Sequence, residues 1–294
     1  MIQTSIFISA TDGLRLHVRC YGGTRSNGLP VICLPGLART AADFEILANA
    51  LSSNPKHPRR VIALDYRGRG QSDYDKDPSN YSFKTETADV LAVLTALDIM
   101  PAVFVGTSRG GILTMLLGAI RPTAMAGVVL NDIGPVIEPQ GLMRIKGYVG
   151  KLPQPRNFED GAEILRRLFG GQFPKHTQTD WLASAHRTFK EQNGALVPTY
   201  DVKLARTFDG VDFERPLPAL WKEFDALVDV PMMVIRGANS DLLSPQTVAA
   251  MRARRSEMDM VEVPDQGHAP LLAEADVIDR IVAFISQCTE ARSH

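Results

Sequence analysis

A serine stands between glycines in the segment Gly106-Thr107-Ser108-Arg109-Gly110-Gly111, directly after the apolar run 102–105. A serine hydroxyl is a useful nucleophile at neutral pH when a nearby base takes its proton during attack. In the pattern Gly-x-Ser-x-Gly, the serine occupies a strained strand-to-helix turn, where a side chain at either glycine would collide with neighbouring backbone. We therefore expect Ser108 to lie exposed at the end of a strand and to act as a nucleophile.

The base and its carboxylate partner are predicted from their positions after apolar runs. His268 lies in a Gly-His turn just after the run 260–263, so it can reach the end of a sheet. Such a histidine needs a carboxylate to fix its tautomer and to stabilise the imidazolium. Asp241 is our prediction for this carboxylate, because it follows the run 232–235 in a turn that precedes a helix. Asp132 follows a strand at the same edge and is the alternative.

Strands must position these residues, and the first third of the chain alternates short apolar runs with amphipathic helical patterns. The runs 31–34, 61–64, 102–105 and 127–130 are typical of strands covered on both faces by helices. Asp12-Gly13 separates two β-rich runs and predicts an antiparallel hairpin at the start. Strands that alternate with helices indicate a largely parallel sheet, and hence an α/β protein.

The alternation stops after residue 134 and resumes at 232–235. The intervening segment shows helical stretches such as 163–169 and 179–189, scattered prolines, and both tryptophans. We expect residues 135–229 to form an inserted helical cap on a core made of residues 1–134 and 230–294.

Composition excludes several classes of protein. The 294 residues carry 32 basic and 33 acidic side chains, a formal net charge of -1, without the basic patch that nucleic-acid binding needs. The longest apolar run is about half a membrane span, and the first ten residues lack a leader pattern. We expect a cytoplasmic protein without nucleic-acid or membrane partners; its oligomeric state is left open.

The sequence predicts neither a metal site nor an organic cofactor. Its three cysteines, Cys20, Cys33 and Cys288, have no metal-ligand spacing, and two of them lie in apolar runs typical of buried, reduced thiols. Histidines at helical i, i+4 spacing and the glycine fingerprint of a dinucleotide-binding turn are both missing.

Five segments in register resemble the α/β-hydrolase family, in its cap-bearing subgroup. They are Leu34-Pro35-Gly36-Leu37, the polar segment 65–72, the segment 106–111 around Ser108, the segment 237–241, and Gly267-His268-Ala269-Pro270. The resemblance covers nearly the whole chain, and the order Ser108, Asp241, His268 is the family's order for its triad. It implies the α/β-hydrolase fold, with a mostly parallel central sheet flanked by helices and an inserted helical cap.

The resemblance also implies an oxyanion hole made by the backbone N–H groups of Leu37 and Arg109. Pro35-Gly36 stands where many relatives have His-Gly, so a side-chain hydrogen bond that steadies the loop is missing here. The Arg109 side chain is also unusual beside the nucleophile. We hypothesise that it recognises a substrate carboxylate; the alternative is a surface ion pair away from the pocket.

The function implied is that of a cofactor-independent serine hydrolase. It would cleave a small carboxylic ester or lactone through an acyl-enzyme on Ser108. From the cap, the side chains expected to line the substrate pocket are those of Met143, Tyr148, Trp181 and Trp221.

Two other functions are open. A hydrolase of carbon–carbon bonds in ring-fission products is one, although Ala269 stands where such relatives commonly carry an aromatic residue. The other is a small-molecule receptor that keeps the triad and turns its ligand over slowly. The rate of turnover distinguishes the receptor from the enzyme.

Overall fold

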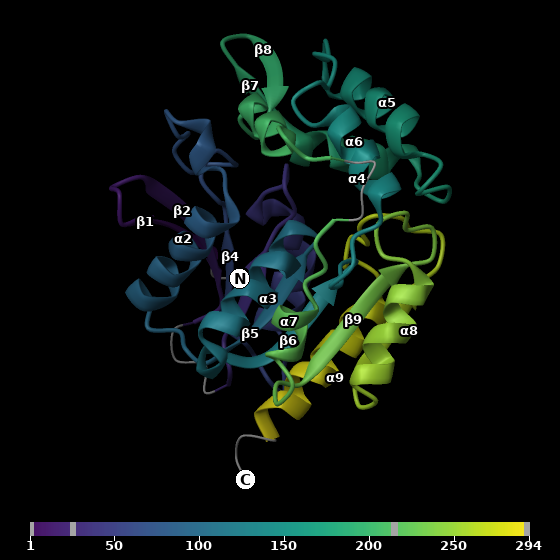
Figure 1. The fold of residues 1–294 in the computed structure, drawn as a ribbon. Coiled ribbons are helices and arrows are strands. Elements are labelled where there is room, and N and C mark those ends of the chain that lie inside the picture. Colours follow the sequence, from purple (N-terminus) through teal and green to yellow (C-terminus); the bar gives the residue numbers. More distant parts are fainter. Residues whose placement is uncertain (1–2, 24–27, 213–216, 291–294) are drawn as a thin grey trace.

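The computed structural model describes residues 3–23, 28–212 and 217–290 (Figure 1). Its central sheet has the strand order β1 (Gln3–Ser9), β2 (Arg15–Tyr21), β4 (Val61–Leu64), β3 (Val31–Leu34), β5 (Ala102–Thr107), β6 (Met125–Asn131), β9 (Met232–Gly237) and β10 (Asp259–Val263). The pairs β1 with β2 and β2 with β4 are antiparallel, and the other neighbours are parallel. The predicted fold class is confirmed.

The first hairpin forms as the Asp12-Gly13 dipeptide predicts. Gly13 has a φ of +86°, a left-handed conformation that glycine adopts without a steric penalty. The Asp12 carboxylate accepts a hydrogen bond from the Leu14 N–H at 3.2 Å, which closes the turn.

Helices cover both faces of the sheet, as the continuous apolar strands require. Ile32 and Leu34 of β3 contribute to one core cluster together with α2 (Phe83–Ala96), α3 (Arg109–Ile120) and α8 (Pro245–Arg254). Val31 and Cys33 contribute to the other, with α1 (Glu45–Ser52) and α9 (Ala275–Glu290). Short 3₁₀ helices, η1 (Ala41–Phe44), η2 (Pro78–Asn80) and η3 (Pro122–Ala124), join these elements.

The segment between β6 and β9 lies mostly beyond the carboxyl ends of the strands (Figure 1). It contains α4 (Pro139–Tyr148), α5 (Phe158–Phe169), α6 (Gln178–Thr188), β7 (Phe189–Gln192), β8 (Ala195–Pro198), η4 (Val202–Phe208) and α7 (Trp221–Asp225). Helices α5 and α6 enclose an apolar cluster of their own around Leu165 and Trp181. In contrast, Phe224 of α7 packs with the main core.

The hairpin of β7 and β8 is a feature that the helical pattern did not predict. Its turn is Asn193-Gly194, and both residues have positive φ, +54° and +77°. Asn-Gly is the dipeptide most typical of a two-residue hairpin turn, so the signal was in the sequence. Among the described helices, none is long and apolar enough to span a bilayer.

Candidate active site

Ser108 lies on a sharp turn between β5 and α3. Its backbone has φ 52° and ψ −115°, a conformation that is strained for a residue with a side chain. A β-carbon on Gly106 would lie 2.6 Å from the backbone of Gly110, and one on Gly110 would lie 2.0 Å from the carbonyl oxygen of Leu34. The prediction that both glycines are needed to make room for backbone is confirmed.

The Ser108 hydroxyl belongs to a chain of three side chains from three different strand ends. His268 Nε2 lies 2.8 Å from Ser108 Oγ, and His268 Nδ1 lies 2.8 Å from Asp132 Oδ2. The Asp132 side chain is fully buried and that of His268 is 6% exposed. A serine, an imidazole and a carboxylate bonded in this order can transfer the hydroxyl proton to the ring while the carboxylate stabilises the resulting charge.

Asp132 is held by more than the histidine. Its Oδ1 accepts a hydrogen bond from the Gly237 N–H at 2.8 Å, and its Oδ2 accepts one from the Ser240 hydroxyl at 2.6 Å. Its own N–H donates to the Ile235 carbonyl at 2.7 Å. Strand β9 and the loop after it therefore orient the carboxylate that faces His268.

The prediction that Asp241 is the partner of His268 is wrong. The Asp241 carboxylate accepts two hydrogen bonds from Arg144 of α4, from Nε at 2.6 Å and from Nη2 at 2.8 Å. Burial opposes its ionisation, but the bonds and charge of Arg144 outweigh this and lower the pKa of Asp241. This aspartate joins the loop after β9 to the inserted segment.

The sequence did hold a signal that separates the two aspartates. Asp132 follows the last residue of β6 directly, and β6 is the neighbour of β5 in the sheet. Asp241 lies four residues beyond Gly237, the last residue of β9, so the loop carries it away from the strand end. The chain order of serine, aspartate and histidine is the same with either residue.

The two N–H groups expected in the oxyanion hole are available. Neither the Leu37 nor the Arg109 N–H donates to an acceptor in the part of the chain that the structure describes. A β-carbon on Gly36 would lie 3.8 Å from Cβ of Ser108, so the loop that presents Leu37 runs beside the nucleophile. Preorganised N–H donors stabilise the negative charge of a tetrahedral intermediate.

A buried carboxylate, Glu86 of α2, connects the two backbone segments that carry these N–H groups. Its Oε1 accepts from Arg69 Nη1 at 2.7 Å, and its Oε2 accepts from Arg109 Nε at 2.6 Å. Arg69 Nε in turn donates to the Leu37 carbonyl at 2.8 Å. Burial opposes ionisation of Glu86, but the charges of Arg109 and Arg69 outweigh it and lower its pKa. No sequence pattern pointed to this anchor, which holds the loop containing Pro35 through the Leu37 carbonyl.

The hypothesis that the Arg109 side chain binds a substrate carboxylate is wrong. The residue is 7% exposed, its Nη2 donates to the Tyr81 carbonyl at 3.2 Å, and its guanidinium lies 4.1 Å from the centre of the Phe83 ring. The alternative of a surface ion pair is wrong as well, because the partner Glu86 is buried. The Phe83 ring and the buried Glu86 carboxylate hold the Arg109 guanidinium away from the cavity.

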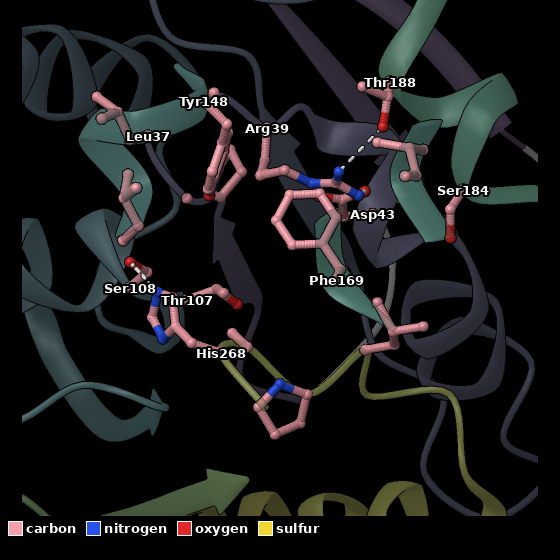
Figure 2. Close-up of a pocket in the computed structure, with 18 of the residues that line it drawn as sticks. Leu37, Arg39, Asp43, Thr107, Ser108, Tyr148, Phe169, Ser184, Thr188 and His268 are labelled. Atoms are coloured by element: carbon pink, nitrogen blue, oxygen red, sulfur yellow. Dashed lines mark hydrogen bonds and ion pairs between the residues drawn. The ribbon is translucent and has the colours of Figure 1, made fainter. Parts of the chain in front are cut away.

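A cavity opens above Ser108 and His268 (Figure 2). From the inserted segment, Tyr148 of α4, Phe169 of α5 and Trp181 of α6 line it, and from the core Leu37 and Thr107 do so. The two expected residues Tyr148 and Trp181 thus line the cavity. His176, which also lines it, has its pKa lowered by burial.

The other two expected lining residues, Met143 and Trp221, lie elsewhere. Met143 is 50% exposed on α4, because the helix turns that position outward. Trp221 of α7 packs edge-on against Phe224, with the Arg254 guanidinium 4.4 Å from its ring centre. Periodicity and residue type did not reveal which side chains of the inserted segment face the cavity.

The described residues contain no group of three or more His, Cys, Asp or Glu side chains arranged to hold a metal ion. Cys20, Cys33 and Cys288 are free and buried. Burial raises the pKa of all three thiols, which keeps them protonated and unreactive at neutral pH.

The sequence and the fold are similar to those of known hydrolases. The family model of the alpha/beta hydrolase fold matches residues 30–275, so the chain belongs to this family. A 3-hydroxybutyrate-oligomer hydrolase of Cupriavidus necator is 31% identical over 290 residues, covering 91% of this chain and 92% of the relative. A 2-(acetamidomethylene)succinate hydrolase of Mesorhizobium japonicum is 25% identical over 83% of each chain.

A solved alpha/beta hydrolase from Novosphingobium aromaticivorans has the same architecture. Its TM-score is 0.87, with 40% identity over 97% of this chain and 98% of that one. The family and these relatives identify the protein as a hydrolase.

Proposed function

We propose that the protein hydrolyses small carboxylic esters or lactones through an acyl-enzyme on Ser108, with His268 as the base and Asp132 as its carboxylate partner. The observation that carries the proposal is the continuous set of contacts, 2.8 Å from Ser108 Oγ to His268 Nε2 and 2.8 Å from Nδ1 to Asp132. The triad acid proposed here replaces Asp241.

The reaction follows from this arrangement. Ser108 Oγ attacks the ester carbonyl while its proton moves to His268 Nε2, and the oxyanion is held by the N–H groups of Leu37 and Arg109. His268 then gives the proton to the leaving alcohol as the carbon–oxygen bond breaks. A water molecule, deprotonated by the same histidine, attacks the acyl-enzyme and releases the acid and free Ser108.

The proposed substrate is a short ester that fits under the inserted segment 135–229, which we propose acts as a cap. Apolar side chains such as Leu165, Phe169 and Trp181 line that side of the cavity. They would exclude water from the acyl group and limit its length. The relative that cleaves 3-hydroxybutyrate oligomers supports hydroxy-acid esters as the candidate class.

Hydrolysis of p-nitrophenyl esters from acetyl to long acyl chains tests the proposal. We expect multiple turnovers by the purified protein and a loss of about 10⁴-fold or more in kcat for Ser108→Ala. Ser286→Ala is the control, because Ser286 lies on α9, where its hydroxyl donates to the Val282 carbonyl. Turnover that survives in Ser108→Ala would show that another residue is the nucleophile.

The same assay, run beside a ring-fission product as a second substrate, separates the other two functions. Cleavage of a ring-fission product without turnover of any ester would favour the carbon–carbon hydrolase. Near single-turnover hydrolysis, accompanied by a ligand-dependent rise in melting temperature, would favour the receptor.

A further inference from the structure

A charged pair lines the otherwise largely apolar cavity: Arg39, in the loop after β3, and Asp43 of η1. Arg39 Nε donates to Asp43 Oδ2 and Nη2 donates to Oδ1, both at 2.6 Å. Its Nη1 donates to Thr188 Oγ1 of α6 at 3.2 Å. Figure 2 shows the side chain extending along the cavity toward Thr188, away from the pair of Ser108 and His268.

The guanidinium keeps donors available for a ligand. Arginine has five N–H groups, and three of them are used by Asp43 and Thr188. The other two have no acceptor among the described residues, and the Arg39 side chain is 33% exposed. Asp43 fixes the plane of the group, so the open edge is preorganised to bind an anion.

The local charge also favours an anion. Asp43 is shared with a second guanidinium, because Arg187 Nε lies 3.6 Å from its Oδ1. Burial and the charge of Arg39 lower the pKa of Arg187, and together they outweigh the attraction of Asp43, Asp180 and Glu45. His176, the other basic group on this part of the cavity, has its pKa lowered by burial and adds no charge at neutral pH.

The position of Arg39 fits a substrate carboxylate that lies a few atoms from the bond that is cleaved. A β-carbon on Gly36 would lie 3.3 Å from Cγ of Arg39 and 3.8 Å from Cβ of Ser108, so the arginine stem begins beside the nucleophile. From there its terminal N–H groups reach along the cavity to Thr188. An ester with a carboxylate a few atoms from its carbonyl could occupy both positions at once.

We infer that Arg39 is a specificity-determining residue that binds the free carboxylate of the substrate. The substrate is then a short hydroxy acid that is esterified at its hydroxyl group and keeps its carboxylate free. This inference rests on the proposed function and deepens it. Arginine binds a carboxylate through two parallel N–H bonds, an arrangement that a neutral amide of the same shape cannot match. The carboxylate would also place a second anion beside Arg39, whose paired carboxylate Asp43 is shared with Arg187.

The test compares two substrates of equal size: the linear dimer of 3-hydroxybutyrate and the same dimer with its carboxylate converted to a primary amide. We expect kcat/KM for the acid to exceed that for the amide by about tenfold or more. Arg39→Gln should reduce this ratio to near one, and Arg39→Lys, which keeps the charge without the planar fork, should give an intermediate ratio.

The matched control is Arg156→Gln. Arg156 also pairs with an aspartate four residues later, Asp160, but it is 86% exposed and outside the cavity. Its substitution should leave the ratio of acid to amide unchanged. Equal turnover of both dimers by the unaltered protein, or a preference that survives in Arg39→Gln, would overturn the inference.

A measurement on the unaltered protein decides the matter if Arg39→Gln does not fold. Hydrolysis of p-nitrophenyl acetate should be inhibited at least about tenfold more strongly by 3-hydroxybutyrate than by 3-hydroxybutanamide, and equal inhibition would refute the carboxylate site. The result is separable from the proposed function. Hydrolysis of p-nitrophenyl acetate that requires Ser108, without a carboxylate preference, removes the Arg39 inference alone.

Discussion

The two sides of the cavity are built in different ways. On the core side, Ser108, Asp132 and His268 each follow a strand, and hydrogen bonds of 2.8 Å join them. On the side of the inserted segment, mostly apolar residues of α4, α5 and α6 form the wall, and their positions depend on how these helices pack. The strand ends therefore position the proposed catalytic residues, whereas helix packing determines the shape of the cavity that would accept the substrate.

The largest expected effect is on kcat, and it comes from comparing two aspartates that both follow strands. Asp132→Asn should lower kcat for p-nitrophenyl acetate by about 10⁴-fold, because an amide cannot hold the productive tautomer of His268 or stabilise its charge. Asp241→Asn should lower kcat by less than about tenfold, since its carboxylate bonds to Arg144 and not to the histidine. Steady-state kinetics with both folded variants measures the difference.

Melting curves of the two variants serve as the control, because Asp132 also accepts bonds from Gly237 and Ser240. The assignment of the triad acid is wrong if Asp241→Asn is the more damaging change in kcat.

The core side was largely predictable from the sequence, and the reason is geometric. Gly-x-Ser-x-Gly after an apolar run requires one backbone path, since side chains at Gly106 and Gly110 would clash with backbone. Apolar runs likewise gave the parallel strands. The choice between Asp132 and Asp241 failed because it was made on residue type and turn context. The distance from the strand end decides it: Asp132 directly follows β6, whereas Asp241 lies four residues beyond the end of β9.

The anchor at Glu86 was hidden for a different reason. Glu86 lies on α2, far in sequence from both Leu37 and Arg109, and a glutamate on a helix is usually exposed. Its contacts with Arg69 and Arg109 depend on how α2 packs against the sheet. Single-sequence patterns carry no information on such pairings.

The second prediction concerns a substitution on the core side of the cavity that leaves the three triad residues unchanged. Glu86→Gln should lower kcat by roughly tenfold, with a smaller change in KM, because the N–H groups of Leu37 and Arg109 lose their common anchor. It should also cost about 3 kcal/mol of folding free energy, since two buried guanidinium groups lose their carboxylate. Urea unfolding and steady-state kinetics measure the two effects.

The pH dependence of this loss has a defined sign. The pKa of Glu86 is lower in the folded protein than its ordinary value of 4.5, so its stabilising contribution is complete above that pH. The contribution is lost as the pH falls through the lowered folded-state pKa. The difference in stability between the unaltered protein and Glu86→Gln should therefore be largest near neutral pH and shrink in acid.

Glu163→Gln is the matched control, because Glu163 also accepts bonds from two arginines, Arg166 and Arg167, but at the surface. Its substitution should barely change stability or kcat, since exposed ion pairs contribute little. Equal effects of the two glutamate substitutions would show that Glu86 does not position the oxyanion donors.

The smallest predicted effect concerns the wall that the inserted segment provides, and the two tryptophans test it. Trp181 lines the cavity and is 4% exposed, whereas Trp221 packs against Phe224 and Arg254 away from it. Trp181→Leu enlarges the cavity, so we expect the preference among p-nitrophenyl esters to move toward longer acyl chains. The ratio of kcat/KM between adjacent chain lengths should change by about tenfold or less, because one buried methylene group contributes about 0.8 kcal/mol.

Trp221→Leu removes the same volume and should leave the chain-length profile unchanged, although both substitutions lower the melting temperature because both remove packed aromatic surface. The comparison therefore separates loss of packing from loss of a pocket wall. A profile that shifts with Trp221→Leu, or one that stays fixed with Trp181→Leu, would mean that the inserted segment rearranges when substrate binds. In that case the closed form of the segment would determine which substrates fit. The cavity would then combine a rigid core side with a movable inserted segment.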